Sequence, residues 1–341
     1  MEKYKEETTM KKLSLVLALL LCFATFCNGA LAATFPEHDL SGVVPYNAGG
    51  GTDNVMRPLA KYAGDILGVT LTVNNMPGAS GATGTAFVAD QAPDGYSVLM
   101  VAEGPCLYDA MKSGKYTFAD FEQICLVGAE PVYIVVAKDS PFQTIKELVD
   151  HAVANPASLT LPISGPAALG SIVGAMLYRT SEAIFANTPS GGDADAFAQL
   201  LSGMADVCIT KTSTIGSYYE TGDVRILAVV DDKRSATFPD VPAITEEIPA
   251  FADSLPFSSF YCVSVRKDTP AEVVTVLKDA FKAAFENEEF QAYLKNTCAV
   301  EPLGYSGEEA DAYIKGWRKS VINALYAAGK IETSPAELGI E

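Results

Sequence analysis

The sequence is poor in the side chains on which most enzyme chemistry depends. It holds two histidines, His38 and His151, and none of its seven cysteines forms a CxxC pair. No HExxH, GxSxG or Walker lysine motif occurs, and the glycines at 49–51 lack the third glycine of a dinucleotide fingerprint, because position 54 is Asn. We therefore expect no catalytic residue, no metal and no cofactor, and a secreted enzyme is the disfavoured alternative.

Positive charge is also scarce. The chain has 24 lysines and arginines against 42 aspartates and glutamates, which gives a formal net charge of −18 at pH 7. Such a surface repels the phosphates of nucleic acids and the headgroups of anionic lipids, so neither is an expected partner. It also repels a small anion at long range, and a site for an anion must therefore depend on local dipoles.

The apolar run near the N-terminus is shorter than the roughly 20 residues that a membrane-crossing helix needs. This run, Leu13–Phe26, follows two lysines and precedes Ala30-Leu31-Ala32, a small-residue pattern that signal peptidase recognises. We expect residues 1–32 to be a signal peptide that is cleaved after Ala32 during export to the periplasm. Three glutamates among the first nine residues are atypical of such a peptide and indicate Met10 as the true start.

The cysteines give no disulfide pattern. Five remain after residue 32, an odd number, and each lies in an apolar stretch where cysteine behaves as a small core residue. The count leaves one bridge open in an oxidising compartment, but buried free thiols are the expectation. These residues are Cys106, Cys125, Cys208, Cys262 and Cys298.

Strand-like and helix-like segments alternate from residue 41 onwards. Strands are predicted at 41–45, 70–74 and 97–102, with helices between them at 53–67 and 82–91. This βαβαβ order predicts a parallel sheet with right-handed crossovers. The alternation then repeats, with strands at 133–137, 159–163, 184–186, 206–209, 225–230 and 257–266, and helices at 144–154, 170–179, 193–202, 271–287, 289–296 and 308–328.

The fold class is therefore α/β with two lobes, each a mainly parallel sheet flanked by helices. No low-complexity linker separates the halves, so we expect crossing strands to join them, at Tyr133–Lys138 and Ser258–Arg266. Lobe 1 would be discontinuous, with residues 33–135 and 259–341, and lobe 2 would span residues 136–258.

Four loops share one design, in which a strand ends, a segment rich in Gly, Ser and Ala follows, and a helix begins. The first turn of a helix has backbone N–H groups without intrahelical partners, and the helix dipole adds positive potential there. Glycine lets a ligand approach this backbone without a Cβ in the way. Loops of two lobes that face one cleft would bind a carboxylate without any lysine or arginine, although glycine in a single loop is ordinary turn chemistry. The loops are 45–53, 75–81, 164–171 and 188–193.

Two glycine-rich segments carry a family resemblance. Val43–Arg57 reads VVPYNAGGGTDNVMR, and Asn75–Tyr96 reads NMPGASGATGTAFVADQAPDGY. Together with Thr188–Val207 and Leu227–Glu246, they resemble the substrate-binding proteins of tripartite tricarboxylate transporters, also called the Bug family. The resemblance implies a type II periplasmic-binding fold whose lobes close on a ligand. It also implies that backbone amides, small side chains and ordered water bind a carboxylate, which a membrane transporter then receives.

The resemblance places candidate ligand contacts on all four loops. The third loop departs from the family pattern, since Pro166-Ala167-Ala168 stands where a histidine is usual. Matched by position, the contacts are Tyr46, Asn47, Ala48, Gly49, Gly50, Gly51, Thr52, Asp53, Ala79, Ser80 and Gly81 in lobe 1, and Ser164, Ala168, Ser171, Gly191, Gly192 and Asp193 in lobe 2.

Glu103 is a further candidate, and it stands where the family usually has a small hydroxyl residue after the third strand. One interpretation is a solvated loop carboxylate. The other is a carboxylate that faces the cleft and pairs with an ammonium group, which favours an amino acid ligand over a tricarboxylate.

The expected function is that of a monomeric solute-binding receptor that delivers a small carboxylate to the subunits of a membrane transporter. A di- or tricarboxylate, an amino acid and an aromatic acid all remain open as ligands. The same fold would serve a sensory protein that presents its ligand to a membrane sensor kinase, and the sequence does not separate the two.

Overall fold

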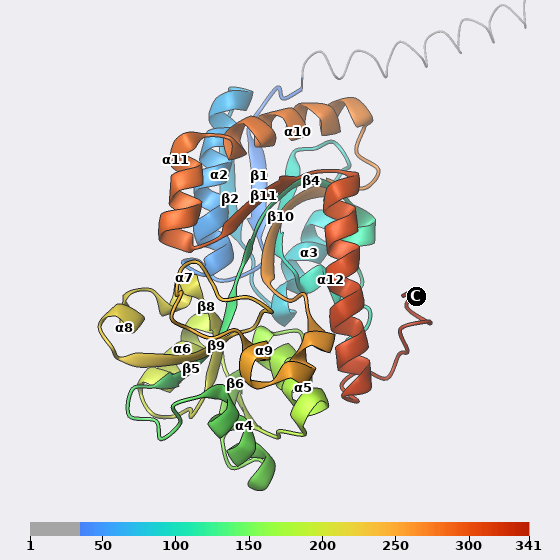
Figure 1. Cartoon of the computed structure of the whole chain (residues 1–341). Helices are drawn as coiled ribbons and strands as arrows, with labels where there is room; N and C mark the ends of the chain where they lie inside the picture. The colour runs from blue at the N-terminus through green and yellow to red at the C-terminus, as the bar shows by residue number, and fades with distance from the viewer. Residues whose placement is uncertain (1–34, 341) are drawn as a thin grey trace, which may run out of the picture.

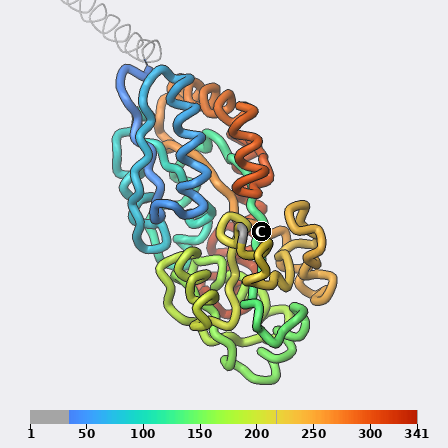
Figure 2. The backbone as a smooth tube through the Cα atoms, turned by 90° about the vertical axis from the view of Figure 1, so that its left-hand side faces the viewer, coloured from blue at the N-terminus to red at the C-terminus, as the bar shows by residue number. Residues whose placement is uncertain are grey.

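The alternating apolar strands and amphipathic helices form two α/β lobes that lie end to end (Figure 1). The computed structural model describes residues 35–340, so the predicted signal peptide, residues 1–32, lies outside the described part. Figure 2 shows one lobe built from the early and late parts of the chain (blue and orange) and one built from its middle (green and yellow). Among the helices of residues 35–340, none has both the length and the apolarity needed to cross a membrane.

Six strands form the sheet of lobe 1, in the order β11-β4-β10-β3-β1-β2, and β1 pairs in parallel with both β2 and β3. The strands are β1 (Leu40–Val44), β2 (Leu71–Asn75), β3 (Ser97–Ala102), β4 (Phe121–Glu130), β10 (Ser259–Arg266) and β11 (Glu301–Tyr305). The helices are α2 (Gly51–Leu67), α3 (Ala82–Ala89), α10 (Ala271–Phe285), α11 (Glu288–Tyr293) and α12 (Glu308–Ala327), with short turns η1 (Ala79–Gly81), η2 (Gly104–Cys106), η3 (Phe118–Asp120) and η5 (Leu294–Cys298).

Apolar side chains are buried on both faces of this sheet, because helices cover both sides. Val44 and Met100 belong to a core that includes residues of α2 and α10, whereas Leu99 and Val101 belong to a core that includes residues of α3 and α12. Successive residues of a strand point to opposite faces, so a strand covered on both sides is apolar throughout. This burial fixes the positions of the loops that follow the strands.

Lobe 2 contains a three-stranded sheet, in the order β8-β5-β9, and a parallel pair of strands, β6 and β7. The strands are β5 (Val132–Ala137), β6 (Thr160–Ile163), β7 (Ala186–Pro189), β8 (Cys208–Lys211) and β9 (Val224–Val229). The helices are α4 (Ile145–Ala154), α5 (Leu169–Ser181), α6 (Asp193–Leu201), α7 (Thr212–Ile215), α8 (Ser217–Glu220) and α9 (Ile244–Glu247), followed by the short turn η4 (Pro249–Ser254).

The two-lobed α/β class is confirmed, and the strand directions add a correction to the mainly parallel sheets that the sequence predicted. β10 runs antiparallel to β3 and β4, and β5 runs antiparallel to β8 and β9. The reason is the path of the chain: β4 leads out of lobe 1 and β10 returns to it, so these neighbouring strands run in opposite directions. β11 adds a further antiparallel pairing with β4 at the edge of the sheet.

The lobes are joined where strands pass between them. β4 ends at Glu130 and β5 begins at Val132, so only Pro131 separates a strand of lobe 1 from a strand of lobe 2. The chain returns at Ser259, where β10 begins, and α12 reaches from lobe 1 to pack against α5 and η4 of lobe 2 (Figure 1). The predicted crossing segments lie on β5, just after the crossing at Pro131, and on β10, whereas the division of the chain at residues 135 and 258 stays a prediction.

The five cysteines that were predicted to be free are buried and unpaired, which confirms that expectation. Two of them, Cys125 and Cys262, lie on the neighbouring strands β4 and β10. Burial raises the pKa of the Cys262 thiol to about 12, so this thiol stays protonated and unreactive at neutral pH.

Trp317 of α12 holds this helix against the place where β10 begins. Its indole Nε1 donates a 2.8 Å hydrogen bond to the carbonyl oxygen of Ser258, and its ring packs against Phe257 and Phe260. Trp317→Phe keeps an aromatic ring but removes the donor, which leaves the carbonyl group without that partner. We expect urea denaturation to give a free energy of unfolding that is lower by about 1–3 kcal/mol.

The matched control is Tyr326→Phe, a change at an exposed position on the same helix. It should alter the free energy of unfolding by less than about 0.5 kcal/mol. Equal stability of the two variants would show that the Trp317 contact does not hold α12 against the returning strand.

Candidate functional site

Loops from the two lobes face each other across a cavity of about 760 Å³. In lobe 1 these loops follow β1, β2 and β3, and in lobe 2 they follow β6, β7 and β8. Ligand crevices of α/β proteins lie outside the carboxyl ends of the strands, which is the arrangement seen here in both lobes.

The first loop leads from β1 into α2 and presents the start of that helix to the cavity. The N–H groups of the first helical turn have no partner within the helix, and Gly50, which precedes the helix, provides no side chain to cap them. Gly51 and Thr52 line the cavity. A Cβ on residue 51 would lie 2.9 Å from the Tyr261 hydroxyl and 3.2 Å from Lys211 Nζ, so only glycine lets this helix start come so close to the floor of the site.

The second loop is a strained turn. Gly78–Gly81 have successive φ angles of 140°, 48°, 53° and 96°, and such angles cost the non-glycine residues Ala79 and Ser80 roughly 1–3 kcal/mol each. The hydroxyl of Tyr108 donates a 3.0 Å hydrogen bond to the carbonyl oxygen of Ser80, and a Cβ on residue 81 would lie 2.7 Å from the same hydroxyl. Tyr108 thus holds the turn in place beside the cavity.

Helices α5 and α6 begin at the cavity from lobe 2. Ala168 precedes α5 and Gly192 precedes α6, and neither residue provides a side-chain cap. Ser164 and Gly191 line the cavity beside these two helix starts. α10 and α12 also begin without a side-chain cap, so what distinguishes α2, α5 and α6 is that all three begin at one cavity.

All of the predicted contacts except Asp53 and Ser171 line this cavity, so the structure brings the four loops together. Those that do so are Tyr46, Asn47, Ala48, Gly49, Gly50, Gly51, Thr52, Ala79, Ser80, Gly81, Glu103, Ser164, Ala168, Gly191, Gly192 and Asp193.

Asp53 is buried outside the lining and ties the first loop to the sheet. Its carboxylate accepts 2.9 Å hydrogen bonds from the N–H of Gly49, from Nε of Arg57 and from Nδ2 of Asn75. Burial alone would raise the pKa of Asp53, but these donors lower it below its ordinary value. The spacing of Asp53 and Arg57 in the motif therefore serves to position the loop.

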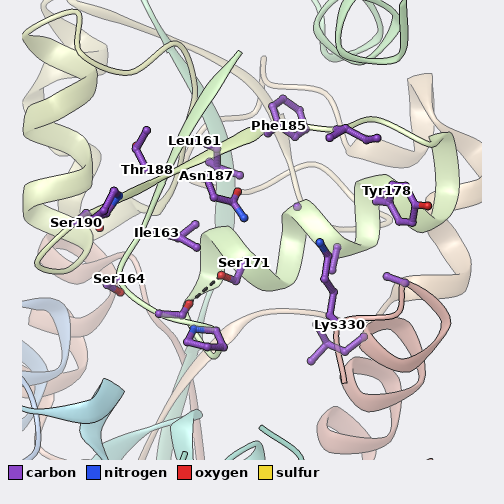
Figure 3. A pocket seen from close by; sticks show the side chains of 18 of the residues that line it. Leu161, Ile163, Ser164, Ser171, Tyr178, Phe185, Asn187, Thr188, Ser190 and Lys330 are labelled. Atoms are coloured by element: carbon purple, nitrogen blue, oxygen red, sulfur yellow. Dashed lines mark hydrogen bonds between the residues drawn. The ribbon is translucent and has the colours of Figure 1, made fainter. Parts of the chain in front are cut away.

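Ser171 lies in the first turn of α5 and lines a second cavity, of about 740 Å³ (Figure 3). Its hydroxyl donates a 2.8 Å hydrogen bond to the carbonyl oxygen of Gly165, drawn as a dashed line in Figure 3, which closes the turn that leads into α5. The walls of this second cavity come from α5, β6, β7 and the end of α12, with Tyr178 and Lys330 among them.

Lys211 also lines the cavity, so the cleft contains a lysine in addition to the helix starts that were predicted to suffice for a carboxylate. Lys211 ends β8, and its side chain is 7% exposed. Its Nζ lies 3.3 Å from Oδ2 of Asp193 and 3.4 Å from the hydroxyl of Tyr261. A lysine at the end of an apolar strand is the sequence signal that could have found it. Further lining residues that the sequence did not suggest are Phe197, Ser213, Thr214 and Tyr218.

Lys211 heads a buried chain of polar groups at the junction of the lobes. The hydroxyl of Tyr261 donates to Oε2 of Glu130, and Oε1 of Glu130 accepts a 2.8 Å hydrogen bond from the N–H of Ser213. Burial raises the pKa of Glu130, and Lys211 opposes that shift. Burial alone would lower the pKa of Lys211, but the neighbouring phenol and carboxylates raise it well above its ordinary value. These neighbours therefore favour the charged form of Lys211.

Glu103 follows β3, lines the cavity and is 7% exposed, which excludes a solvated loop carboxylate. Its Oε2 accepts hydrogen bonds from the hydroxyl of Ser259 at 2.8 Å and from the N–H of Phe260 at 3.4 Å. Burial raises the pKa of Glu103, and the charge of Lys211 opposes that shift. The contact of Glu103 with a ligand stays a prediction.

Comparison with known proteins gives a consistent set of relatives. The sequence matches a family model described as "Tripartite tricarboxylate transporter family receptor" over residues 55–321. It is 31% identical over 268 residues to the UPF0065 protein in the gbd 5′ region of Cupriavidus necator, with 78% of this chain and 80% of that protein covered. The solved structure of the periplasmic binding protein BugD is 30% identical, with a TM-score of 0.79 and coverage of 88% of this chain and 100% of that one.

Two further solved structures contain bound acids, and their likeness to this chain shows the fold alone. R. palustris Rpa4515 with adipate is 23% identical, with a TM-score of 0.79 and coverage of 86% of this chain and 98% of that one. MatC (Rpa3494) from Rhodopseudomonas palustris with bound malate is 21% identical, with a TM-score of 0.76 and coverage of 86% and 100%. These neighbours confirm the predicted two-lobed periplasmic-binding fold.

The role of the α2 start in ligand binding is tested by a side chain that fills the space in front of it. Gly50 has an extended backbone, with φ −75° and ψ 168°, which valine also adopts, and its Cβ would lie 3.3 Å from the carbonyl oxygen of Asn47. In calorimetric titration with a carboxylate that the unmutated protein binds, Gly50→Val should bind at least about 100-fold more weakly. Stability should fall by no more than about 1 kcal/mol, the effect of a poor N-cap residue.

The control for this variant is Gly316→Val, at an exposed position of α12 where an added Cβ meets no atom within 4 Å. It should bind the ligand as the unmutated protein does. Retained affinity in the Gly50 variant would move the site away from α2.

Proposed function

This chain belongs to the family of tripartite tricarboxylate transporter receptors, and from that premise we propose that it captures a small carboxylate between its two lobes and holds it without chemical change. The observation that carries the proposal is the convergence of three uncapped helix starts, from both lobes, on one cavity that Lys211 also lines.

Helix starts and a buried lysine suit a carboxylate for electrostatic reasons. Each helix start offers free N–H donors and a partial positive charge, worth about 0.3–1 kcal/mol to a nearby anion and up to about 2 kcal/mol when partly buried. α2 belongs to lobe 1, whereas α5 and α6 belong to lobe 2. A carboxylate among them is therefore held best when the lobes are together, and this difference in affinity lets the ligand shift a hinge equilibrium towards closure.

The bound acids of the structural neighbours support the ligand class. Rpa4515 holds adipate and MatC holds malate, and both ligands are small dicarboxylates. We propose a ligand of the same general size, with a di- or tricarboxylate, an amino acid and an aromatic acid as the candidates.

Export and delivery complete the proposal. Residues 1–32 direct the chain to the periplasm, cleavage follows Ala32, and the mature monomer passes its ligand to the subunits of a membrane transporter. The family description and the periplasmic BugD structure support this placement. On closure, lobe 1 moves as one body against lobe 2, with the boundaries near Pro131 and Ser259.

Binding without chemistry is supported by the groups that the site offers. Within residues 35–340, the lining of the cavity contains neither histidine nor cysteine. His38 stacks on Tyr96, and His151 packs against Phe142, so both histidines are engaged elsewhere.

A thermal-shift screen followed by calorimetry tests the function. The panel contains succinate, malate, adipate, citrate, amino acids and aromatic acids, each with the amide of its carboxylates as the matched control. A specific ligand at 100 times its dissociation constant should stabilise the protein by about 2.7 kcal/mol. Failure of every carboxylate, or equal stabilisation by the amides, would contradict the proposal.

Lobe closure is tested where Gly165 of lobe 2 meets Ser80 of lobe 1. A Cβ on residue 165 would lie 2.6 Å from Oγ of Ser80. We expect Gly165→Ala to hold the lobes apart and weaken ligand binding by about 10-fold, because the carboxylate loses donors from one lobe. In small-angle scattering, the radius of gyration of this variant should no longer shrink when ligand is added.

Two further variants separate collision from backbone strain. Ser80→Ala in the Gly165→Ala chain removes the colliding hydroxyl and should restore binding, since Cβ of Ser80 is 3.9 Å away. Gly203→Ala, at a φ of +75° with no atom within 4 Å, tests strain alone. If Gly165→Ala binds ligand as well as Gly203→Ala does, these two loops do not meet on closure.

A further inference from the structure

Glu103 combines deep burial with an acceptor atom that no protein group uses. It is 7% exposed and lines the cavity just after β3. Its Oε2 accepts hydrogen bonds from Ser259 and Phe260, whereas no residue of the described chain, 35–340, donates to Oε1. Oε1 does not belong to the fully buried polar atoms of residues 35–340 that lack a partner, so it opens to the cavity, where a donor that arrives with the ligand can reach it.

The other carboxylates that line the cavity have a different environment. Asp193 is partly exposed and lies 3.3 Å from Nζ of Lys211. Asp195 is exposed, and its Oδ2 accepts a 2.7 Å hydrogen bond from the N–H of Gly191. Within residues 35–340, no ion pair of 4.0 Å or less joins Lys211 to Glu103. Within the described chain Glu103 therefore has no ion pair of its own, and the charge of Lys211 acts on it only from beyond 4.0 Å.

We infer that the ligand carries an ammonium group as well as a carboxylate, and that Glu103 binds the ammonium; this inference rests on the proposed function. The carboxylate lies at the starts of α2, α5 and α6 with Lys211, and the ammonium lies just beyond the end of β3. A plain di- or tricarboxylate would bring another negative charge near Glu103, which Coulomb repulsion disfavours. The ligand class is therefore an amino acid.

The acids found in the structural neighbours supply the skeletons for matched probes. Succinate, malate and aspartate differ only in the hydrogen, hydroxyl or ammonium on one carbon. Adipate with 2-aminoadipate, and 3-phenylpropionate with phenylalanine, extend the comparison to longer and aromatic acids. Calorimetric titration of the mature chain at neutral pH should show the amino member at least about 10-fold tighter in one or more of these pairs.

Glu103→Gln tests the role of the carboxylate directly, because glutamine keeps the shape and removes the charge. It should weaken the amino acid by about 10- to 100-fold, whereas its des-amino partner should keep its affinity or bind up to about threefold more tightly, because the repulsion is gone. Asp195→Asn is the matched control: it removes one negative charge from the same cavity but not the buried acceptor, so it should change both members of a pair by the same factor. Glu103→Ser is the second variant, and thermal melts verify that each variant is folded before titration.

The outcomes separate the two proposals. Tighter binding of an amino member, lost selectively in Glu103→Gln, supports the ammonium site. Equal binding of the paired acids by the unmutated protein, or equal weakening of both by Glu103→Gln, overturns the ammonium site and leaves the carboxylate receptor standing. Binding of no acid in any pair, nor in the wider carboxylate panel, overturns the proposed function and the ammonium site with it.

Discussion

Backbone N–H groups that remain free at helix starts are the interaction on which the rest of the site depends. They are available because Gly50, Ala168 and Gly192 stand where a capping side chain would otherwise accept them. They converge because the strands that precede these helices, β1, β6 and β7, end at the same cavity. The surrounding sequence preserves this arrangement: Gly51 allows the close approach to Tyr261, and Tyr108 holds the strained turn at Ala79 and Ser80. In a chain with a net charge of −18, such local donors decide where an anion binds.

The buried polar chain beneath the cavity connects the site to the junction of the lobes. Glu130 ends β4 and Tyr261 lies on β10, the two strands by which lobe 1 meets lobe 2. Lys211 and Ser213 come from lobe 2, so these hydrogen-bonded groups connect the two lobes. Buried charges are costly unless each has partners, and they are commonly retained where they fix one arrangement of the surrounding groups. The same contacts that form the floor of the cavity therefore also define how the lobes meet.

Much of the site could be predicted because its signal is local, and the rest could not because its cause is tertiary. Glycine-rich strand-to-helix loops can be recognised in the sequence, and most of their residues line the cavity. Asp53 belongs to the same motif, yet its carboxylate holds the loop instead of facing the cavity, a distinction that spacing does not carry. Lys211 was missed because its place at the end of an apolar strand does not reveal its burial or its contacts with Asp193 and Tyr261, which depend on tertiary packing. The antiparallel directions of β5 and β10 follow from the passage of the chain between the lobes, which the periodicity of the sequence does not show. Glu103 could be recognised in the sequence as a departure from the family pattern, but its burial could not be predicted.

A crystal structure of the protein with its bound ligand tests the central claim most directly. The claim predicts a carboxylate oxygen within 2.7–3.2 Å of backbone nitrogens at the start of α2 and at the start of α5 or α6, between the lobes. A ligand that lay instead in the second cavity along α5 and β7, or that met the main cavity only through side chains, would contradict it.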